Sequence, residues 1–382
     1  MTLSFSSSSS IEEKNDSTEK MMVVRSPLRF LGPYPTIPLR FPNLATPSQR
    51  QRNVSGVSLD WVLDTAANVN TINAQVAKEL ALEKVGVAPG GVGAAGDIVG
   101  GDTFLLGDCE LDIPRDNKTV DQVNDANNVD DDNGINEFVF MKGLTASALP
   151  VASPAAAGLL GLAFFYCFEG GVEFRWGIAS TIETSGDKVA EFDDDRIPSV
   201  TFYGNDEGLR LDGLTRVPFE SLPGSMLPAV TLYINGKEIP ALFDTGSPIT
   251  VFNSCAAEEA GIDTVISLGN LNPEKAGWNP FSKISRDIAA ATSKGDILTI
   301  AGIGGAPIRL VRSTSPVNFN ILESGRKPHP LSSARVYVGD LPGLAALGGL
   351  GGGASPAVVL GMDLISTRQR LIFRARQCEI YL

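Results

Sequence analysis

Two aspartates, Asp64 and Asp244, lie in matching local sequences that suit acid–base chemistry. Asp64 follows the apolar run of "WVLDTAANVNTI", and Asp244 follows that of "ALFDTGSPITVFN". A carboxylate beside a buried run is costly unless it is paired or hydrogen-bonded. The chain has one histidine, His329, in the polar segment "SGRKPHPLSS", which we interpret as a solvated loop residue. Any acid–base chemistry must therefore be carried by carboxylates.

The two aspartates belong to an internal repeat. Residues 55–82 align with residues 235–262, and each has a polar hairpin signal, an apolar strand, Asp-Thr with small residues, a second apolar strand and a short helix. A glycine-rich segment and an apolar segment with glycine then follow in each half: 90–101 and 158–165, then 302–310 and 357–365. Three features in the same order predict two structurally similar halves.

The elements that position these aspartates are predicted to be mainly β. Forty Gly and 24 Pro separate short apolar runs, which is typical of strands joined by turns. Helices are predicted only at 73–82, 254–261 and 281–293. Strands are predicted in these runs: "LLGDCELDI", "EFVFMKGL", "SVTFYG", "VTLYI", "GDILTIAGIGG", "APIRLVRS", "ARVYVGDL" and "RLIFRARQCEIYL".

Several of these segments resemble the aspartic peptidases of the pepsin-like and retropepsin-like clan. The resemblance is carried by "LFDTGSPITVF", "VVLGMDLI" and the last strand "LIFRARQCEIYL", and it covers roughly residues 30–382. It implies a two-lobed pepsin-like β-barrel fold with pseudo-twofold lobes and a central cleft. We expect a disordered segment at 1–25, an N-terminal lobe at 26–212 and a C-terminal lobe at 213–382.

In such a family the two aspartates form a catalytic dyad, here Asp64 and Asp244. Two close carboxylates cannot both ionise easily, so they share one proton. The ionised member takes a proton from a water, and the protonated member polarises the scissile carbonyl. The resemblance implies that Thr65 and Thr245 hydrogen-bond across the pseudo-twofold axis. No metal, cofactor or covalent intermediate is expected.

The resemblance also implies supporting and substrate-binding residues. The residues expected to support the active-site loops are Thr65, Ala66, Thr245, Gly246, Ser247, Gly161 and Gly361. Flexible flaps that close over an extended peptide are expected at Gly91, Gly93, Gly304 and Gly305.

The leading hypothesis is thus an aspartic endopeptidase that hydrolyses extended polypeptides. The alternative is a catalytically impaired member of the same fold that binds peptides or a protein partner. Ala66 favours this alternative, because it stands where the family has Gly and would be strained if the position requires positive φ. Pro248 is a second departure, since it removes a backbone donor from the second loop.

Other function classes have weaker support. "GVGAAG" (91–96) fits the dinucleotide fingerprint, but the strand-like sequence after it favours a hairpin tip. The acidic segment 116–137 does not place ligands at the first and twelfth positions of a calcium loop. The net charge of −13 without a basic cluster argues against nucleic acid.

Several features of the sequence bear on location and processing. It shows no transmembrane-length run and no signal-peptide pattern, so an intracellular location in the cytoplasm or a plastid is favoured. Four widely spaced cysteines are interpreted as reduced. We expect a monomer. Residues 19–52 could be a basic pro-segment or could supply the first strand.

Overall fold

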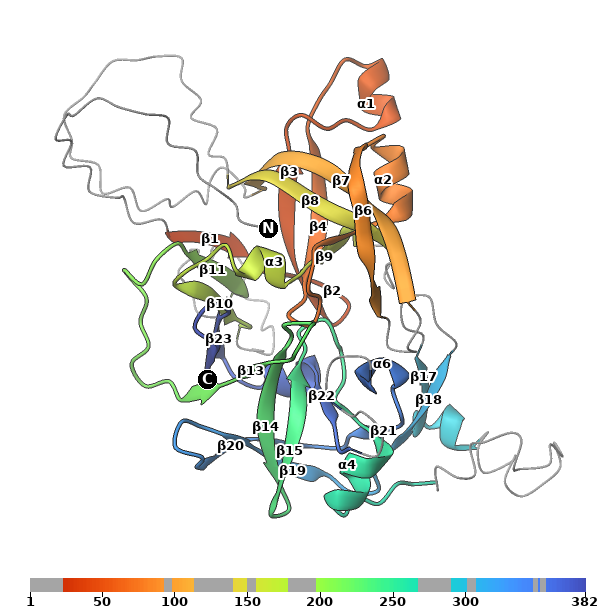
Figure 1. Cartoon of the computed structure of the whole chain (residues 1–382), viewed down its shortest axis with the longest axis vertical. Coiled ribbons are helices and arrows are strands. Elements are labelled where there is room, and N and C mark those ends of the chain that lie inside the picture. Colours follow the sequence, from red (N-terminus) through yellow and green to blue (C-terminus); the bar gives the residue numbers. More distant parts are fainter. Residues whose placement is uncertain are drawn as a thin grey trace, which may run out of the picture.

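The protein is described by a computed structural model, which is mainly β, as predicted. It describes residues 23–92, 98–112, 140–149, 156–177, 197–266, 290–300, 307–345, 350 and 355–382. The described strands form three sheets (Figure 1). Two of them are built from separate halves of the chain, and the third contains strands from both halves.

The first sheet uses the strands from β2 to β9. Its spatial order is β2-β3-β4-β9-β5-β8-β7-β6, and β3 also pairs with β7, so six of the strands form a closed ring. The strands are β2 (Arg29–Leu31), β3 (Tyr34–Phe41), β4 (Val57–Leu63), β5 (Thr71–Asn73), β6 (Glu83–Val92), β7 (Ile98–Leu111), β8 (Met141–Leu149) and β9 (Gly158–Leu160).

The second sheet uses the strands from β13 to β22. Its order is β17-β18-β21-β16-β22-β15-β14-β19-β20, with β13 beside β14. The strands are β13 (Glu220–Ser221), β14 (Pro228–Ile234), β15 (Lys237–Phe243), β16 (Val251–Phe252), β17 (Ile297–Ile300), β18 (Ile308–Arg312), β19 (Val317–Leu322), β20 (Pro328–Ala334), β21 (Tyr337–Val338) and β22 (Val358–Leu360).

The two sheets share one strand order. The path β3-β4-β9-β5-β8-β7-β6 of the first sheet corresponds to β14-β15-β22-β16-β21-β18-β17 of the second. In both sheets, the strand that precedes the Asp runs parallel to the strand that precedes Gly161 or Gly361. These parallel pairs are β4 with β9 and β15 with β22. The internal repeat of the sequence thus corresponds to a repeated arrangement of strands.

The connecting sheet joins the two halves. Its order is β1-β11-β10-β23-β24-β12, and it lies beside the region where the other two sheets meet (Figure 1). Its central pairing, β10 with β23, joins residues that are far apart in the chain. The strands are β1 (Val23–Pro27), β10 (Gly171–Arg175), β11 (Ser199–Tyr203), β12 (Arg216–Pro218), β23 (Arg370–Arg374) and β24 (Glu379–Tyr381).

Helices are short in the described parts of the chain. Two predicted helices are confirmed with shorter bounds, as α2 and α4. Most of the third, predicted at 281–293, lies outside the described residues, and its described part, 290–293, is helical. Asn73 and Asn253 cap α2 and α4 through their side chains. The helices are α1 (Pro47–Gln51), α2 (Ala74–Glu79), α3 (Leu162–Phe165), α4 (Ser254–Glu259), α6 (Pro342–Ala345) and α7 (Met362–Ile365).

The structure corrects two boundaries. Residues 23–25, predicted to be disordered, lie in β1, and residues 1–22 are outside the described residues. The predicted last strand, "LIFRARQCEIYL", is two strands, because the chain turns at 375–378 and Cys378 takes a φ of 54°. Residues 23–52 form β1, β2, β3 and α1, so this part of the region at 19–52 belongs to the fold.

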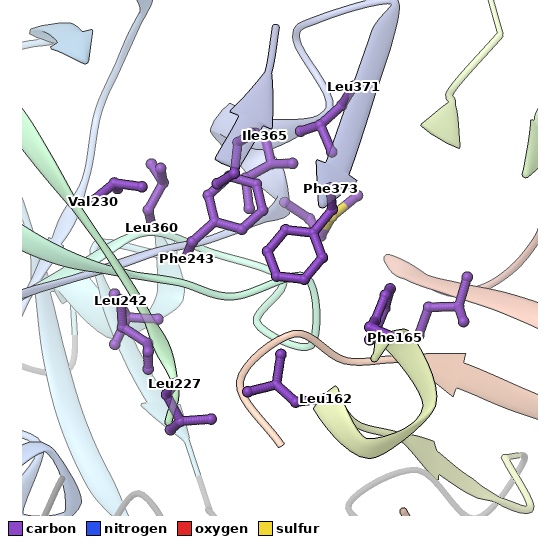
Figure 2. Close-up of a cluster of buried hydrophobic side chains, with 14 of the residues drawn as sticks. Leu162, Phe165, Leu227, Val230, Leu242, Phe243, Leu360, Ile365, Leu371 and Phe373 are labelled. Carbon is purple, nitrogen blue, oxygen red and sulfur yellow. The ribbon is translucent and has the colours of Figure 1, made fainter. Parts of the chain in front are cut away.

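Large apolar side chains fill the region between the two halves. Phe373 of β23 contacts Phe165 edge-on at 5.3 Å between ring centroids and stacks on Phe243 at 6.1 Å. Figure 2 shows these rings with Leu162, which follows Gly161, and Leu360, which precedes Gly361. This apolar cluster therefore fixes the ends of the strands that carry the two aspartates.

Candidate active site

Asp64 and Asp244 stand directly after buried strands, as the sequence predicted. The residues before them, Leu63 and Phe243, are at most 1% exposed. The backbone N–H of Asp64 donates to the carbonyl of Leu160, and that of Asp244 donates to Leu360, both at 3.0 Å. The apolar strands and their parallel neighbours thus hold both aspartates in equivalent positions.

The two carboxyl groups meet in space. They share a side-chain hydrogen bond, and each remains partly open to solvent. The N–H of Ala66 donates to Oδ1 of Asp64 at 2.8 Å, and the N–H of Gly246 donates to Oδ1 of Asp244 at the same distance. The site is therefore a carboxyl pair with matched backbone donors.

Thr65 and Thr245 bind the two loops to each other. Each hydroxyl donates to a carbonyl of the opposite strand: Thr65 to Phe243 at 2.8 Å, and Thr245 to Leu63 at 2.7 Å. Each hydroxyl also accepts the N–H of the other threonine at 3.1 Å. Both threonines are fully buried. These reciprocal bonds fix the separation of the aspartates that precede them.

Burial raises the pKa values of both carboxyls, and repulsion by Asp64 adds to the rise for Asp244. Burial raises the pKa of Asp64 to about 6, although N–H donors from Ala66 and Ala67 oppose the change. The pKa of Asp244 is raised well above its ordinary value by burial and then by the negative charge of Asp64. The pair therefore titrates as a unit and retains one proton over a wide pH range.

Gly161 and Gly361 lie against the Asp loops. The N–H of Leu162 donates to the carbonyl of Ala67 at 2.7 Å, and Met362 donates to Ser247 at 2.8 Å. A Cβ on either glycine would come within 2.4 Å of a loop carbonyl oxygen. Only glycine allows this approach, which accounts for the residue at both positions.

Ala66 and Gly246 occupy equivalent positions in the two loops, and they differ in how much room there is for a Cβ. Neither Ala66 nor Gly246 takes a positive φ, so Ala66 does not have the backbone strain considered from the sequence. A Cβ on Gly246, however, would lie 2.4 Å from Cγ of Asp64. The methyl of Ala66 is partly buried and packs against the hydrophobic core. The hydroxyl of Ser247 donates to the carbonyl of Ile249 at 2.8 Å.

The predicted flap residues are placed only in part. β6 and β7 form an antiparallel hairpin in which Gly91 pairs with Val99 and Val92 with Ile98. Gly91 and Val92, the first two residues of "GVGAAG", therefore end β6, and the other four residues lie outside the described residues. Gly93, Gly304 and Gly305 lie outside the described residues.

Sequence reasoning missed a second layer of polar residues. Asn70 and Thr250 stand at the same offset from their aspartates, and each side chain accepts the N–H of the supporting glycine, Gly161 or Gly361, at 3.1 Å. The Thr250 hydroxyl donates to Asp363 at 2.7 Å. Asn70 and Thr250 could have been found from the sequence, because each lies at the same distance along the chain from the Asp of its own repeat.

Metal-binding clusters and membrane-spanning helices are absent from the described part of the chain. Its His, Cys, Asp and Glu side chains form no cluster able to hold a metal ion. In the same residues, no helix has the length and apolarity needed to cross a membrane. No known family model matches the chain, and no curated protein is significantly similar to it.

Proposed function

We propose that the chain is an aspartic-type endopeptidase with a pepsin-like two-lobed architecture. The observation that carries the proposal is the hydrogen-bonded pair of Asp64 and Asp244 on loops that are joined through Thr65 and Thr245. A carboxyl pair with raised pKa values suits general acid–base catalysis near neutral pH. The matching strand orders of the two halves support the two-lobed architecture.

The proposed reaction uses a water between the carboxyl groups. Asp64, as the carboxylate, takes a proton from this water, and the resulting hydroxide adds to the carbonyl carbon of the peptide bond. Asp244, which retains its proton, donates it to the carbonyl oxygen and stabilises the tetrahedral intermediate. The intermediate then breaks its C–N bond as the proton held by Asp64 passes to the leaving amine. One hydroxyl of the intermediate returns its proton to Asp244, so that the carboxylic acid product forms and the pair recovers its single proton.

The proposed substrate is a polypeptide in extended conformation, which such a site would accept between the halves. The hairpin of β6 and β7 is a suitable cover, because it projects beyond the ring of the first sheet. Val85 and Val87 of β6 are 49% and 71% exposed and offer apolar surface to a peptide.

A catalytically impaired peptide-binding module is the second candidate, and Ala66 is the observation that favours it. The backbone N–H of Ala66 nevertheless keeps the same 2.8 Å bond to its aspartate as Gly246 does. The donor function of the loop is therefore retained with the extra methyl. For this reason we favour the enzyme over the binding module.

The experiment is peptide cleavage followed by mass spectrometry. The full chain is incubated with a mixed peptide library from acidic to neutral pH, beside Asp64→Asn and Asp244→Asn. The exposed Asp212→Asn is the matched control, since it makes the same change away from the pair. Cleavage that survives in Asp212→Asn and is lost in both dyad variants supports the proposal. Absence of cleavage by folded wild-type protein at every pH would favour the binding module.

A further inference from the structure

Tyr34 begins β3 at a position that the strand register sets beside the dyad. β3 pairs antiparallel with β4, and the described pairs begin at Thr36 and Val62. Continuing this register by two residues puts Tyr34 opposite Asp64. Residues directly opposite in an antiparallel pair project from the same face of the sheet. The Tyr34 side chain and the Asp64 carboxyl therefore leave the sheet on the same side.

The electrostatics agree with this placement. Burial raises the pKa of the Tyr34 phenol, and the charges of Asp244 and Asp64 raise it further. Both carboxyls therefore act on Tyr34, although one belongs to each half of the chain. The phenol remains protonated at neutral pH and serves as a hydrogen-bond donor.

The second half of the chain has no equivalent hydroxyl. The pairing of β14 with β15 matches Ala229 to Leu242, and continuing it sets Leu227 opposite Asp244. Leu227 is 3% exposed and lies in the apolar cluster of Figure 2. At this position an apolar side chain is therefore enough for packing. The hydroxyl beside Asp64 is an addition that packing does not require.

The Tyr34 hydroxyl is also available for a ligand. Tyr34 is half-buried, and its hydroxyl makes no hydrogen bond to another described residue. A hydroxyl beside a reactive pair gains most when a ligand supplies the missing acceptor. An extended peptide presents such acceptors as its backbone carbonyls.

We propose that Tyr34 is a substrate-positioning residue whose hydroxyl donates a hydrogen bond to a backbone carbonyl of the peptide next to the scissile bond. This inference rests on the proposed peptidase function. It adds a contact on the Asp64 side that the Asp244 side lacks, so the bound peptide is held asymmetrically across the pair. The contact acts on binding and leaves the titration of the dyad unchanged.

The test compares Tyr34→Phe with wild type and with Tyr233→Phe. Tyr233 is half-buried on β14 and pairs with Glu238, about 20 Å along β15 from Asp244 at ~3.3 Å per residue. We would measure KM, kcat and the pH profile on a peptide found by the library experiment, and the Kd of a statine-containing pentapeptide. Thermal unfolding of all three proteins verifies that they are folded.

Loss of one neutral hydrogen bond predicts a rise of about 2- to 10-fold in KM and in the Kd of the statine peptide for Tyr34→Phe. kcat and both limbs of the pH profile stay unchanged, and Tyr233→Phe behaves as wild type. Unchanged KM and Kd in Tyr34→Phe would overturn the role of Tyr34 while wild-type cleavage upholds the peptidase. A fall in kcat or a displaced pH limb with unchanged KM would also overturn it.

A wild-type protein that binds the statine peptide without cleaving peptides would contradict the peptidase alone, and the Kd comparison would still decide the role of Tyr34. A wild-type protein that neither cleaves nor binds would overturn both proposals.

Discussion

Thr65 and Thr245 join the two Asp loops through four hydrogen bonds, in which each threonine uses its hydroxyl and its N–H in the same way. The hydroxyl donors lie 2.7–2.8 Å from their carbonyl acceptors, and the N–H donors lie 3.1 Å from the opposite hydroxyl. Because both side chains are fully buried, water cannot replace a lost partner. The geometry of the carboxyl pair therefore depends on both threonines.

Thr65→Val tests this dependence. The substitution keeps the shape but leaves the carbonyl of Phe243 and the N–H of Thr245 without partners, which costs about 1–3 kcal/mol per buried group. We expect a lower free energy of unfolding, measured in urea, and a fall in kcat of at least about tenfold, since small displacements in a catalytic pair are costly. Thr231→Val, on half-buried β14, is the control. Equal stability of the two variants would contradict this account of the loops.

A second prediction follows from the lack of room for a side chain between Gly246 and Asp64. A Cβ on Gly246 would lie 2.4 Å from both Cγ and Oδ2 of Asp64, so Gly246→Ala must displace the carboxyl pair. We expect kcat/KM to fall by about 100-fold or more, as misplacement of catalytic groups by about 1 Å does. Ala66→Gly removes a methyl that the site already accommodates, and we expect activity within about threefold of wild type.

Ala66→Gly also serves as the matched comparison, because it changes one methyl on the other loop of the pair. Steady-state kinetics of the two variants test the prediction. A Gly246→Ala enzyme as active as the Ala66→Gly enzyme would mean that the pair tolerates displacement.

The sequence predicted the strands and the pairing of the aspartates because both depend on local patterns. β14, for example, alternates buried and half-buried residues along its length, as the run "VTLYI" indicates. The repeated Asp-Thr motif predicted two similar halves, and its resemblance to the pepsin-like clan implied that the two strands end at a common site. This reasoning succeeds when each pattern lies within one short segment.

Tyr34 and the connecting sheet could not be predicted in this way. The position of Tyr34 depends on the register between β3 and β4, and α1 lies between these strands in the chain. The pairing of β10 with β23 joins the two halves across most of the chain. Non-local pairings are decided by the packing of the whole fold, and no window of sequence contains them.

The raised pKa values predict an activity profile that differs from that of ordinary carboxyls. Below about pH 6 both members of the pair carry protons, and the reaction lacks its base. Activity should rise as the pH passes through about 6 and persist until Asp244 loses its proton. The measurement is kcat/KM against pH, with Asp212→Asn as control. An acid limb near the ordinary carboxyl pKa of 3.8 would contradict it.

The same shift predicts how stability depends on pH. A carboxyl whose folded pKa is raised contributes stability that is fully present below its unfolded pKa and is lost as the pH rises through the folded value. For Asp64 that window extends from about pH 4 to about 6. Asp64→Asn, which carries no charge, should raise the melting temperature at about pH 7 and change it little at about pH 4. The opposite order in thermal unfolding would show that Asp64 is not destabilised by its burial.

Glu173, at 1% exposure, is the centre of the charge network in the connecting sheet. Arg370 binds it with two hydrogen bonds of 2.9 Å, and Arg175 and Tyr203 add bonds of 2.6 and 2.8 Å. Burial opposes ionisation of Glu173, but hydrogen bonds from Arg370, Arg175 and Tyr203 outweigh it and hold its pKa below the ordinary value. Its stabilising contribution is therefore present above about pH 4.5 and lost as the pH falls through the lower folded pKa.

Glu173→Gln removes the charge and keeps the size of the side chain. Breaking one partner of a buried network costs about 3 kcal/mol, so we expect the urea midpoint to fall strongly at neutral pH and less in acid. Glu238→Gln is the matched control, because Glu238 pairs with Arg326 at a site where both side chains are at least 45% exposed. Such exposed pairs contribute about 0–1 kcal/mol. If the two substitutions changed the urea midpoint equally, the network around Glu173 would contribute no more to the junction of the halves than a surface ion pair does.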